Sequence, residues 1–259
     1  MRDDRSDRAE AARLQALDLE AHLADPARKQ RFVTPMFDVI APRYDDFTRI
    51  FSFGMDRGWK RELIEEADRV APQRLVAVDL ACGTGDLTFE IGRLRPGAIV
   101  VGIDASERMI RAAIERCPEE GAARTSLIVG DMSSIDLPSA TADLITAGYG
   151  FRNAPDHRAS LRDAARVLKP GGHLITLDFY RPENAIWRAL LVGYLKVAGS
   201  VIGWLWHRAP VVYAYLGPSV HHFVSWQSFS RSLEAAGFVV ESVSPKLFGA
   251  IAIHRARRR

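Results

Sequence analysis

The feature that most constrains the fold is the stretch VAVDLACGTGDL at residues 76–87. In it, an apolar run ends in Asp79, and a Gly-Thr-Gly turn at 83–85 leads into a segment with helical spacing. Glycines in such a turn let a ligand approach the main chain closely. A second apolar run, VVGIDAS, carries Asp104 at its end, about 20 residues after the turn. This order of strand, glycine turn, helix, strand and acid is typical of a nucleoside-binding βαβ unit.

The glycine spacing narrows the class of nucleoside. Thr88 stands where the dinucleotide fingerprint G-x-G-x-x-G has its third glycine, and the turn has no Walker lysine. A nucleoside without a pyrophosphate fits this pattern better. S-adenosylmethionine is therefore the cofactor that we expect.

Strand-like and helix-like segments alternate from residue 74 onward. Such alternation predicts an α/β fold with a doubly wound, mostly parallel, seven-stranded sheet. We expect strands at 75–80, 99–103, 126–130, 142–147, 173–179, 238–243 and 249–254, and helices at 86–94, 107–116, 160–168 and 228–236.

Other parts of the chain stand outside this alternation. Residues 1–30 form a polar N-terminal extension, which the composition predicts as a solvated helix or as chain without fixed structure. Residues 31–70 are apolar and aromatic at helical spacing, and they predict an N-terminal helical cap. The cofactor-binding domain then covers 71–259, with a helical lid inserted at about 183–222.

The lid contains an apolar run, IWRALLVGYLKVAGSVIGWLW, at 186–206. Its length suits a membrane span, but Arg188 and Lys196 lie inside it, and central cations cost about 2.5–3.5 kcal/mol each on insertion. We therefore expect an amphipathic or fully packed helix. Core packing is one interpretation. The alternative is a wall for a lipophilic substrate, in contact with the membrane surface.

Charge and cysteine content limit the partners and the compartment. The formal net charge of +3 argues against a nucleic-acid binder. The basic run at 254–259 is either a frayed, soluble end or an attraction to membranes and anionic partners. Cys82 and Cys117 lack metal or disulfide spacing, which suits a reducing compartment. No apolar signal segment opens the sequence, so we expect a cytoplasmic protein, with peripheral contact at the inner face of a membrane left open.

Five sequence blocks together resemble the ubiquinone/menaquinone biosynthesis C-methyltransferases, within the class I S-adenosylmethionine-dependent methyltransferases. The resemblance spans about residues 31–245 and implies the Rossmann-like methyltransferase fold. The blocks are MFDVIAPRYD with SFGMDRGWKR (36–61), VAVDLACGTGDL (76–87), VGIDAS with Met109 (101–109), GYGFRNAPD (148–156) and RVLKPGGHLITLDF (166–179).

The resemblance also implies an activity, which is methyl transfer to a ring carbon of a polyprenylated benzoquinol or naphthoquinol. One alternative is a methyltransferase of a soluble aromatic molecule. Another is a cofactor-binding assembly protein without catalysis, which departures from the family's usual residues at Thr48, Gly148 and Tyr180 leave open. The sequence does not indicate an oligomeric state.

Eight residues are expected to bind the cofactor. The Asp104 carboxylate has two oxygens to accept from the two ribose hydroxyls, and Asp79 is expected to hold the glycine turn or a water beside the cofactor. The resemblance implies that Asp131 and Met132 flank the adenine. The set is Asp79, Gly83, Thr84, Gly85, Asp104, Asp131, Met132 and Gly148.

Three residues are expected to act on the acceptor. The Arg152 guanidinium would stabilise a phenolate, with a salt bridge to Asp156 or another acid as the alternative. Asn153 either contacts the substrate or caps the next helix, and Tyr44 either closes over the ligands or packs as an ordinary aromatic. The pair His221-His222 lacks a third ligand, so we expect no metal site. A contact of one of these histidines with the acceptor is an alternative that the resemblance implies.

Overall fold

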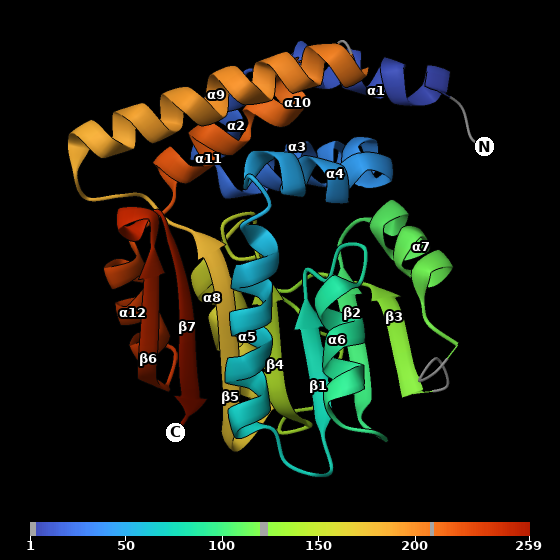
Figure 1. Cartoon of the computed structure of the whole chain (residues 1–259), viewed down its shortest axis with the longest axis vertical. Coiled ribbons are helices and arrows are strands. Elements are labelled where there is room, and N and C mark those ends of the chain that lie inside the picture. The colour runs from blue at the N-terminus through green and yellow to red at the C-terminus, as the bar shows by residue number, and fades with distance from the viewer. Residues whose placement is uncertain (1–3, 120–123, 208–209) are drawn as a thin grey trace.

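A seven-stranded sheet forms the centre of the described chain (Figure 1). The computed structural model describes residues 4–119, 124–207 and 210–259, so 1–3 of the predicted extension and 208–209 of the predicted lid lie outside the described residues. The strand order is β3-β2-β1-β4-β5-β7-β6, and β7 runs antiparallel to both of its neighbours. The predicted fold class is confirmed. The strands are β1 (Val76–Leu80), β2 (Ile99–Asp104), β3 (Thr125–Val129), β4 (Ala142–Gly148), β5 (Leu168–Phe179), β6 (Phe238–Lys246) and β7 (Ile251–Arg258).

The order of the strands reverses beside β1, which pairs in parallel with both β2 and β4. In that register Asp79 lies opposite Gly102 on one side and Thr146 on the other. In open α/β sheets the crevice for a ligand forms beyond the carboxyl ends of the strands at such a reversal. The glycine turn follows β1 directly, so the topology places it at that crevice.

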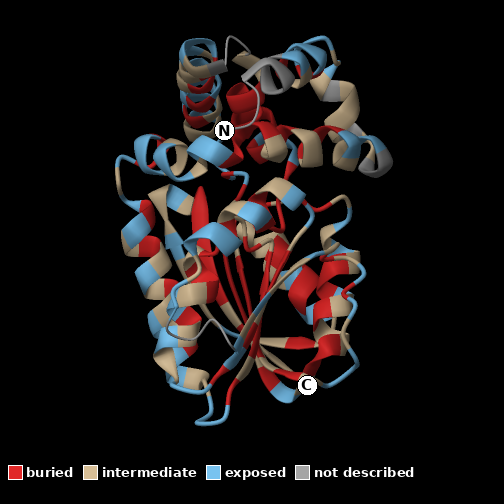
Figure 2. Cartoon of the chain, turned by 90° about the vertical axis from the view of Figure 1, so that its right-hand side faces the viewer, coloured by how far each residue is buried: buried red, intermediate tan, exposed pale blue. Residues whose placement is uncertain are grey.

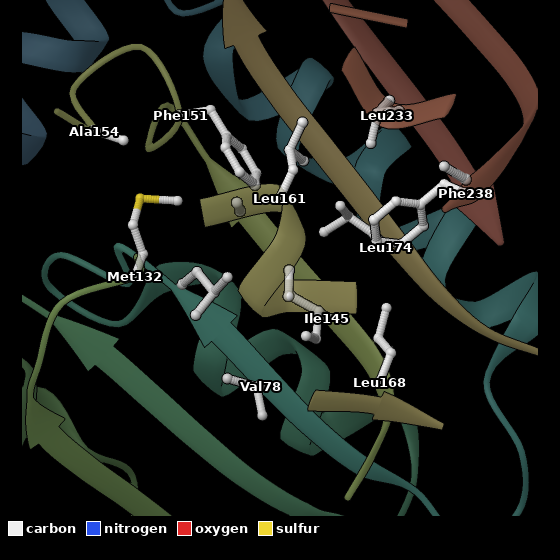
Figure 3. Packing of buried hydrophobic residues seen from close by; sticks show 14 of the residues in the cluster. Val78, Met132, Ile145, Phe151, Ala154, Leu161, Leu168, Leu174, Leu233 and Phe238 are labelled. Carbon is white, nitrogen blue, oxygen red and sulfur yellow. The ribbon is translucent and has the colours of Figure 1, made fainter. Parts of the chain in front are cut away.

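Helices cover both faces of the sheet and bury alternate strand residues. Ala77 and Leu144 face α5 and α6, whereas Val78 and Ile145 face α8 and α12. Figure 3 shows the second of these cores, in which Ile145 and Leu174 of the strands pack together with Phe151. Buried residues gather along the strands and the helix faces turned toward them (Figure 2). The flanking helices are α5 (Asp56–Val70), α6 (Asp86–Leu94), α7 (Glu107–Arg116), α8 (His157–Val167) and α12 (Trp226–Ala235).

The predicted cap at 31–70 is too long at its end, because α5 belongs to the sheet. Trp59, Leu63 and Ala67 repeat at helical spacing and are buried in one core with sheet residues such as Ile175 and Ile251. Burying a large apolar side chain contributes about 1.5–3 kcal/mol, which favours packing this face on the sheet.

The remaining helices form a layer above the carboxyl ends of the parallel strands (Figure 1). We call α1–α4 with η1 the cap, and α9–α11 the lid. The first 30 residues are not a solvated extension, since Ala11 and Leu14 of α1 pack against Phe32 and Met36 of α3. The cap comprises α1 (Asp4–Gln15), α2 (Leu19–Ala24), α3 (Pro26–Ile40), η1 (Ala41–Arg43) and α4 (Tyr44–Phe51), and the lid comprises α9 (Ala185–His207), α10 (Pro210–Ala214) and α11 (Leu216–His222).

The basic run at 254–259 does not form a frayed end. Most of it lies in β7, between β5 and β6, and Ala256 is fully buried there. Arg255 forms an ion pair with Glu66 at 2.6 Å, and Arg257 pairs with Glu241 at 2.9 Å. The chain ends at the side of the sheet opposite the cap and lid (Figure 1). These arginines therefore stabilise the sheet and lie far from the lid.

Candidate functional site

Two neighbouring cavities lie between the sheet and the layer of cap and lid helices. The first, which borders the turn at Gly83, is the glycine-turn cavity. Phe37, Tyr44 and Tyr149 line both cavities and so stand between them. The glycine-turn cavity is lined by Gln30, Val33, Thr34, Phe37, Tyr44, Ala81, Gly83, Asp104, Ala105, Ser106, Met109, Gly130, Asp131, Met132, Gly148, Tyr149, Gly150, Asn153, Ala154 and Pro155. The second, the cap–lid cavity, is lined by Met36, Phe37, Ile40, Tyr44, Phe47, Thr48, Phe51, Ser52, Tyr149, Arg152, Phe179, Val212, Tyr213, Tyr215 and Leu216.

The glycine turn requires its glycines. Gly83 and Gly85 adopt φ values of +55° and +90°, a region that side chains rarely enter. A Cβ on Gly85 would lie 2.5 Å from the Phe89 ring, so the turn and the first residues of α6 fit only without a side chain. Gly83 lines the cavity with its backbone, whereas Gly85 shapes the turn and does not line the cavity.

Asp104 ends β2 and lines the glycine-turn cavity. One of its carboxylate oxygens accepts from the Gly83 amide at 2.9 Å and the other from the Ser106 amide at 2.8 Å. Burial raises the pKa of this carboxyl to about 6. Each carboxylate oxygen has a second lone pair, so Asp104 can still accept from a pair of ligand hydroxyls.

Asp79 lies below the cavity and does not line it. The Thr88 and Thr146 hydroxyls donate to its two carboxylate oxygens at 2.7 and 2.8 Å. Burial raises its pKa to about 6. The side chain therefore ties the start of α6 to β4 and supports the glycine turn indirectly.

Asp131, Met132 and Gly148 also line the glycine-turn cavity. Asp131 accepts from the Ser133 amide and hydroxyl, both at 2.7 Å, and this fixes its carboxylate. A Cβ on Gly148 would lie 2.8 Å from Leu87, so the backbone passes there too closely for a side chain. These three residues lie together at the site, as the sequence predicts.

Thr84 is predicted to contact the cofactor, but in the structure its side chain contacts the cap. Its hydroxyl donates to Asp45 of α4 at 2.9 Å, and it does not line the glycine-turn cavity. Arg116 of α7 donates to the same Asp45 at 2.6 Å. Thr84 therefore fastens the cap to the glycine turn.

Helix α3 covers the glycine-turn cavity and supplies wall residues that the sequence prediction missed. Gln30, Val33, Thr34 and Phe37 share one face of this helix by their spacing. Lys29, one residue earlier, donates to the Arg152 and Ala154 carbonyls, both at 2.8 Å. The only sequence signal for these wall residues is the amphipathic spacing of the helix. That spacing predicts that one face is buried, but it does not predict which part of the molecule the face contacts.

The cap–lid cavity is mostly apolar and aromatic, but Arg152 contributes a charge. The Arg152 guanidinium donates to the Ser219 hydroxyl at 2.7 Å and to the Asn153 side-chain oxygen at 3.0 Å. Its Nε lies 3.5 Å from the buried Asp178 carboxylate, so its acidic partner is Asp178 rather than Asp156. This pairing holds the cation in place at the wall of an apolar cavity.

The sequence as a whole matches a known family. The profile of the ubiE/COQ5 methyltransferase family matches residues 25–258. The chain belongs to this family. It is 37% identical over 205 residues to the ubiquinone/menaquinone biosynthesis C-methyltransferase UbiE of Syntrophotalea carbinolica, covering 79% of this chain and 84% of that protein. It is 35% identical over 219 residues to the demethylmenaquinone methyltransferase of Thermus thermophilus, covering 85% of this chain and 98% of that protein.

Solved structures share the fold at low sequence identity. The [4+2]-cyclase SpnF superposes with a TM-score of 0.65 at 17% identity, over 87% of this chain and 94% of its own. The YcgJ protein of Bacillus subtilis superposes with a TM-score of 0.57 at 15% identity, over 77% of this chain and 99% of its own. One fold carries different reactions, so the activity comes from the family. The chain is an S-adenosylmethionine-dependent methyltransferase, and the predicted family, enzyme class and cofactor are confirmed.

Asn153 of the methyltransferase does not cap the following helix. Asp156 is the N-cap of α8 and accepts from the Arg158 amide at 2.8 Å. The Asn153 amide donates to the Tyr149 carbonyl at 2.9 Å, and its oxygen accepts from Tyr215 at 3.1 Å. Asn153 therefore holds the loop after β4 in shape and also lines the glycine-turn cavity.

His221 and His222 of the methyltransferase lie at the exposed end of α11 and line neither cavity. The structure therefore gives no support to the alternative that one of them contacts the acceptor. Across the described ranges, no group of three or more His, Cys, Asp or Glu side chains has the arrangement of a metal site.

Proposed function

We propose that this methyltransferase methylates a ring carbon of a prenylated quinol in ubiquinone or menaquinone biosynthesis. The observation that carries the proposal is the apolar, aromatic cap–lid cavity with the Arg152 cation in its wall, next to the glycine-turn cavity. A quinol has a flat apolar ring, a long apolar chain and oxygens that need polar partners. The printed names of the relatives concern the same class of compound.

The residues that line the glycine-turn cavity suit S-adenosylmethionine. Backbone at Gly83 and Gly148 borders the space without side chains, and carboxylates at Asp104 and Asp131 can accept from hydroxyl and amino groups. We assign Asp104 to the ribose, and Asp131 with Met132 to the adenine. When bound, the cofactor supplies an activated methyl group, so the protein has mainly to position the acceptor and stabilise its charge.

The acceptor carbon becomes a strong nucleophile when the neighbouring hydroxyl is deprotonated. A guanidinium does not readily act as a base, so Arg152 is assigned to stabilising the phenolate oxygen. In a cavity lined by Phe47, Phe51 and Phe179, little water screens this interaction. Tyr44 stands between the two cavities and is assigned to orienting the ring toward the methyl group.

Methyl transfer from labelled S-adenosylmethionine tests the acceptor class directly. We expect transfer to prenylated benzoquinols or naphthoquinols and much slower transfer to soluble phenols without a chain. Efficient methylation of a soluble phenol, with no transfer to any prenylated quinol, would overturn the proposal. Cofactor binding without transfer to either acceptor would support the assembly-protein alternative instead.

We also propose that the lid contacts the membrane in which such a quinol resides. Helix α9 is the one described helix long and apolar enough to cross a membrane, yet one of its faces packs on α10 and α11. Its other face carries an apolar stripe in which each side chain is more than half exposed. The apolar stripe consists of Ile186, Leu190, Val197, Val201, Trp204 and Leu205.

Charge and continuity favour a lipid surface as the occupant of the apolar stripe. Helix α9 contains Arg188 and Lys196 but no acidic residue, which suits anionic headgroups. Phe53, in the turn between α4 and α5, is three-quarters exposed and stacks on Tyr194 of α9 with ring centroids 6.0 Å apart. This joins the apolar stripe to the Ser52 end of the cap–lid cavity. A quinol could thus pass from lipid to the cavity along apolar surface.

Vesicle flotation tests this contact. We expect the wild type to float with vesicles that contain phosphatidylglycerol, and Leu190→Glu with Val197→Glu to remain in solution. Ile114→Glu is the matched control, because Ile114 is also an exposed apolar residue on a helix, but on α7. Equal flotation of the double variant and the wild type would contradict the proposal. If the wild type instead forms a dimer without lipid, and the double variant is a monomer, the apolar stripe is an interface between two copies of the chain and the membrane proposal is overturned.

A further inference from the structure

Tyr149 has a buried hydroxyl that satisfies no hydrogen bond among the residues that the structure describes. The residue is 7% exposed and lines both the glycine-turn cavity and the cap–lid cavity. A buried polar group without a partner costs about 1–3 kcal/mol, so phenylalanine would be the more stable choice for packing alone. The hydroxyl thus points to a partner that is present only when the site is filled.

The backbone at Tyr149 strengthens this conclusion. Its φ is +61°, a conformation that suits glycine and that costs about 1–3 kcal/mol for other residues. The strain is held by the Tyr149 amide, which donates to the Leu177 carbonyl at 2.6 Å, and by its carbonyl, which accepts from Asn153. The chain keeps a large side chain at a position where its two neighbours, Gly148 and Gly150, have none. Strained residues of this kind cluster at ligand sites.

The hydroxyl is suited to donate. Burial, together with the nearby Asp56, Tyr44 and Asp178 side chains, raises the pKa of Tyr149 well above its usual value. The phenol therefore keeps its proton at physiological pH. Its ring is fixed by an aromatic contact to Phe179, with centroids 5.6 Å apart, so the donor is held in one direction.

We propose that the Tyr149 hydroxyl donates a hydrogen bond to an oxygen of the acceptor ring and so selects acceptors that carry a second oxygen. This inference rests on the proposed function, in which Arg152 stabilises the oxygen that becomes a phenolate. Arg152 and Tyr149 both line the cap–lid cavity, so they supply two donors to one flat ring. A buried donor discriminates strongly against a ligand that leaves it unpaired.

The variant Tyr149→Phe removes only the hydroxyl and tests the proposal. We expect the affinity for a 1,4-naphthoquinol to fall about tenfold, since one hydrogen bond is lost. The affinity for 1-naphthol, which lacks the second oxygen, and for S-adenosylhomocysteine should not change. The melting temperature should stay equal or rise, because the free protein loses an unpaired polar group.

The matched control is Tyr180→Phe. Tyr180 is fully buried, but its hydroxyl lies 3.3 Å from His254 in the core and lines neither cavity. This variant should lose stability and keep the affinity for both naphthyl ligands. Equal quinol affinity of Tyr149→Phe and the wild type would overturn the inference, as would an equal loss for both naphthyl ligands.

The ligand-affinity ratio does not depend on turnover. A wild type that binds the quinol in a Tyr149-dependent manner but methylates only soluble phenols would overturn the proposed function and leave the Tyr149 inference standing. If the wild type and Tyr149→Phe methylate prenylated quinols at equal rates and bind them with equal affinity, the proposed function stands and the Tyr149 inference is overturned.

Discussion

Asp104 combines two properties whose pH dependences oppose each other. Its pKa in the folded protein is about 6, above the value of about 3.9 in an unfolded chain. The folded state therefore binds more protons between these values, and the unliganded protein loses stability as the pH rises through this window. Ribose hydroxyls, in contrast, need the carboxylate as acceptor, so cofactor affinity should rise as the pH passes 6.

Titration calorimetry with S-adenosylhomocysteine between pH 5 and 8 measures this opposition. We expect the wild-type affinity to increase with pH and the Asp104→Asn variant to bind weakly at every pH. Asp136→Asn, which changes an exposed aspartate outside the site, should behave like the wild type. A wild-type affinity that is constant across the range would contradict the assignment of Asp104 to the ribose.

Arg152 is best tested by a change that keeps its charge. Removing the side chain would take away the ion-pair partner of the buried Asp178, at a cost of about 3–5 kcal/mol. Arg152→Lys keeps a cation but loses the planar group of donors. We expect kcat to fall by about 100-fold or more, by analogy with the loss of one oxyanion donor, while S-adenosylhomocysteine binding stays within about twofold. Arg158→Lys, exposed on α8, is the control, and an unchanged kcat at Arg152→Lys would refute its role.

Sequence patterns located much of the site at this scale, but not the partners of each residue. Asp104, Asp131 and Arg152 follow strands whose ends the apolar runs predict, and all three line a cavity. Of the two alternatives for Asn153, the helix cap is excluded because Asp156 caps α8, and the partner Tyr215 is 62 residues away. Tyr149 was missed, since an unsatisfied hydroxyl is a property of packing and not of spacing.

At the scale of elements, the close approach of α9 and α10 depends on a single glycine. A Cβ on Gly199 would lie 2.5 Å from the Tyr213 carbonyl oxygen, which is backbone and cannot rotate away. We expect Gly199→Ala to destabilise the protein by about 1–3 kcal/mol and to raise KM for the acceptor, because Tyr213 lines the cap–lid cavity.

Gly193→Ala is the control in the same helix. A Cβ there meets nothing within 4 Å, so alanine should raise stability by about 0.5–1 kcal/mol through its better helix propensity. Thermal unfolding and KM of both variants check the comparison. Equal melting temperatures for the two variants would mean that the helices can separate without cost.

Helices with clear caps were the easiest elements to predict. Those at 86–94 and 107–116 have the predicted bounds, because a glycine turn precedes α6 and Ser106 caps α7 by accepting from the Met109 amide. The final strand was predicted too short, since its arginines have the composition of a free basic tail. Their acidic partners, Glu66 and Glu241, lie on other elements.

For the whole molecule, β7 decides whether the sheet is continuous. It connects β6 to the rest of the sheet, and Arg255 to Arg257 lie opposite Ile175 to His173 of β5. We expect deletion of residues 255–259 to abolish cooperative thermal unfolding followed by circular dichroism. Arg257→Gln should cost less than about 1 kcal/mol, because it removes a partly exposed ion pair and leaves the strand in place. A truncated protein with a normal melting curve would contradict this view of β7.

The position of the two cavities next to each other depends on the whole molecule, and no single sequence motif predicts it. The alternating pattern predicts the sheet, and the glycine turn predicts one binding site at its edge. The wall of the second cavity comes from α3, α4, α10 and α11 as well as the loop after β4 and the end of β5. Its shape depends on how separate segments pack, and this information is distributed over the full sequence.

The hydrogen bonds that hold the cap in place bear on the rate at which ligands exchange. Hydrogen bonds join the cap to loops that surround the glycine-turn cavity. They run from Lys29 to the Arg152 and Ala154 carbonyls, from Thr84 to Asp45, and from the Ser106 hydroxyl to Asp38 at 2.6 Å. We expect these contacts to open before spent S-adenosylhomocysteine leaves. Exchange of the donor would then require the same motion of the cap in each round of catalysis.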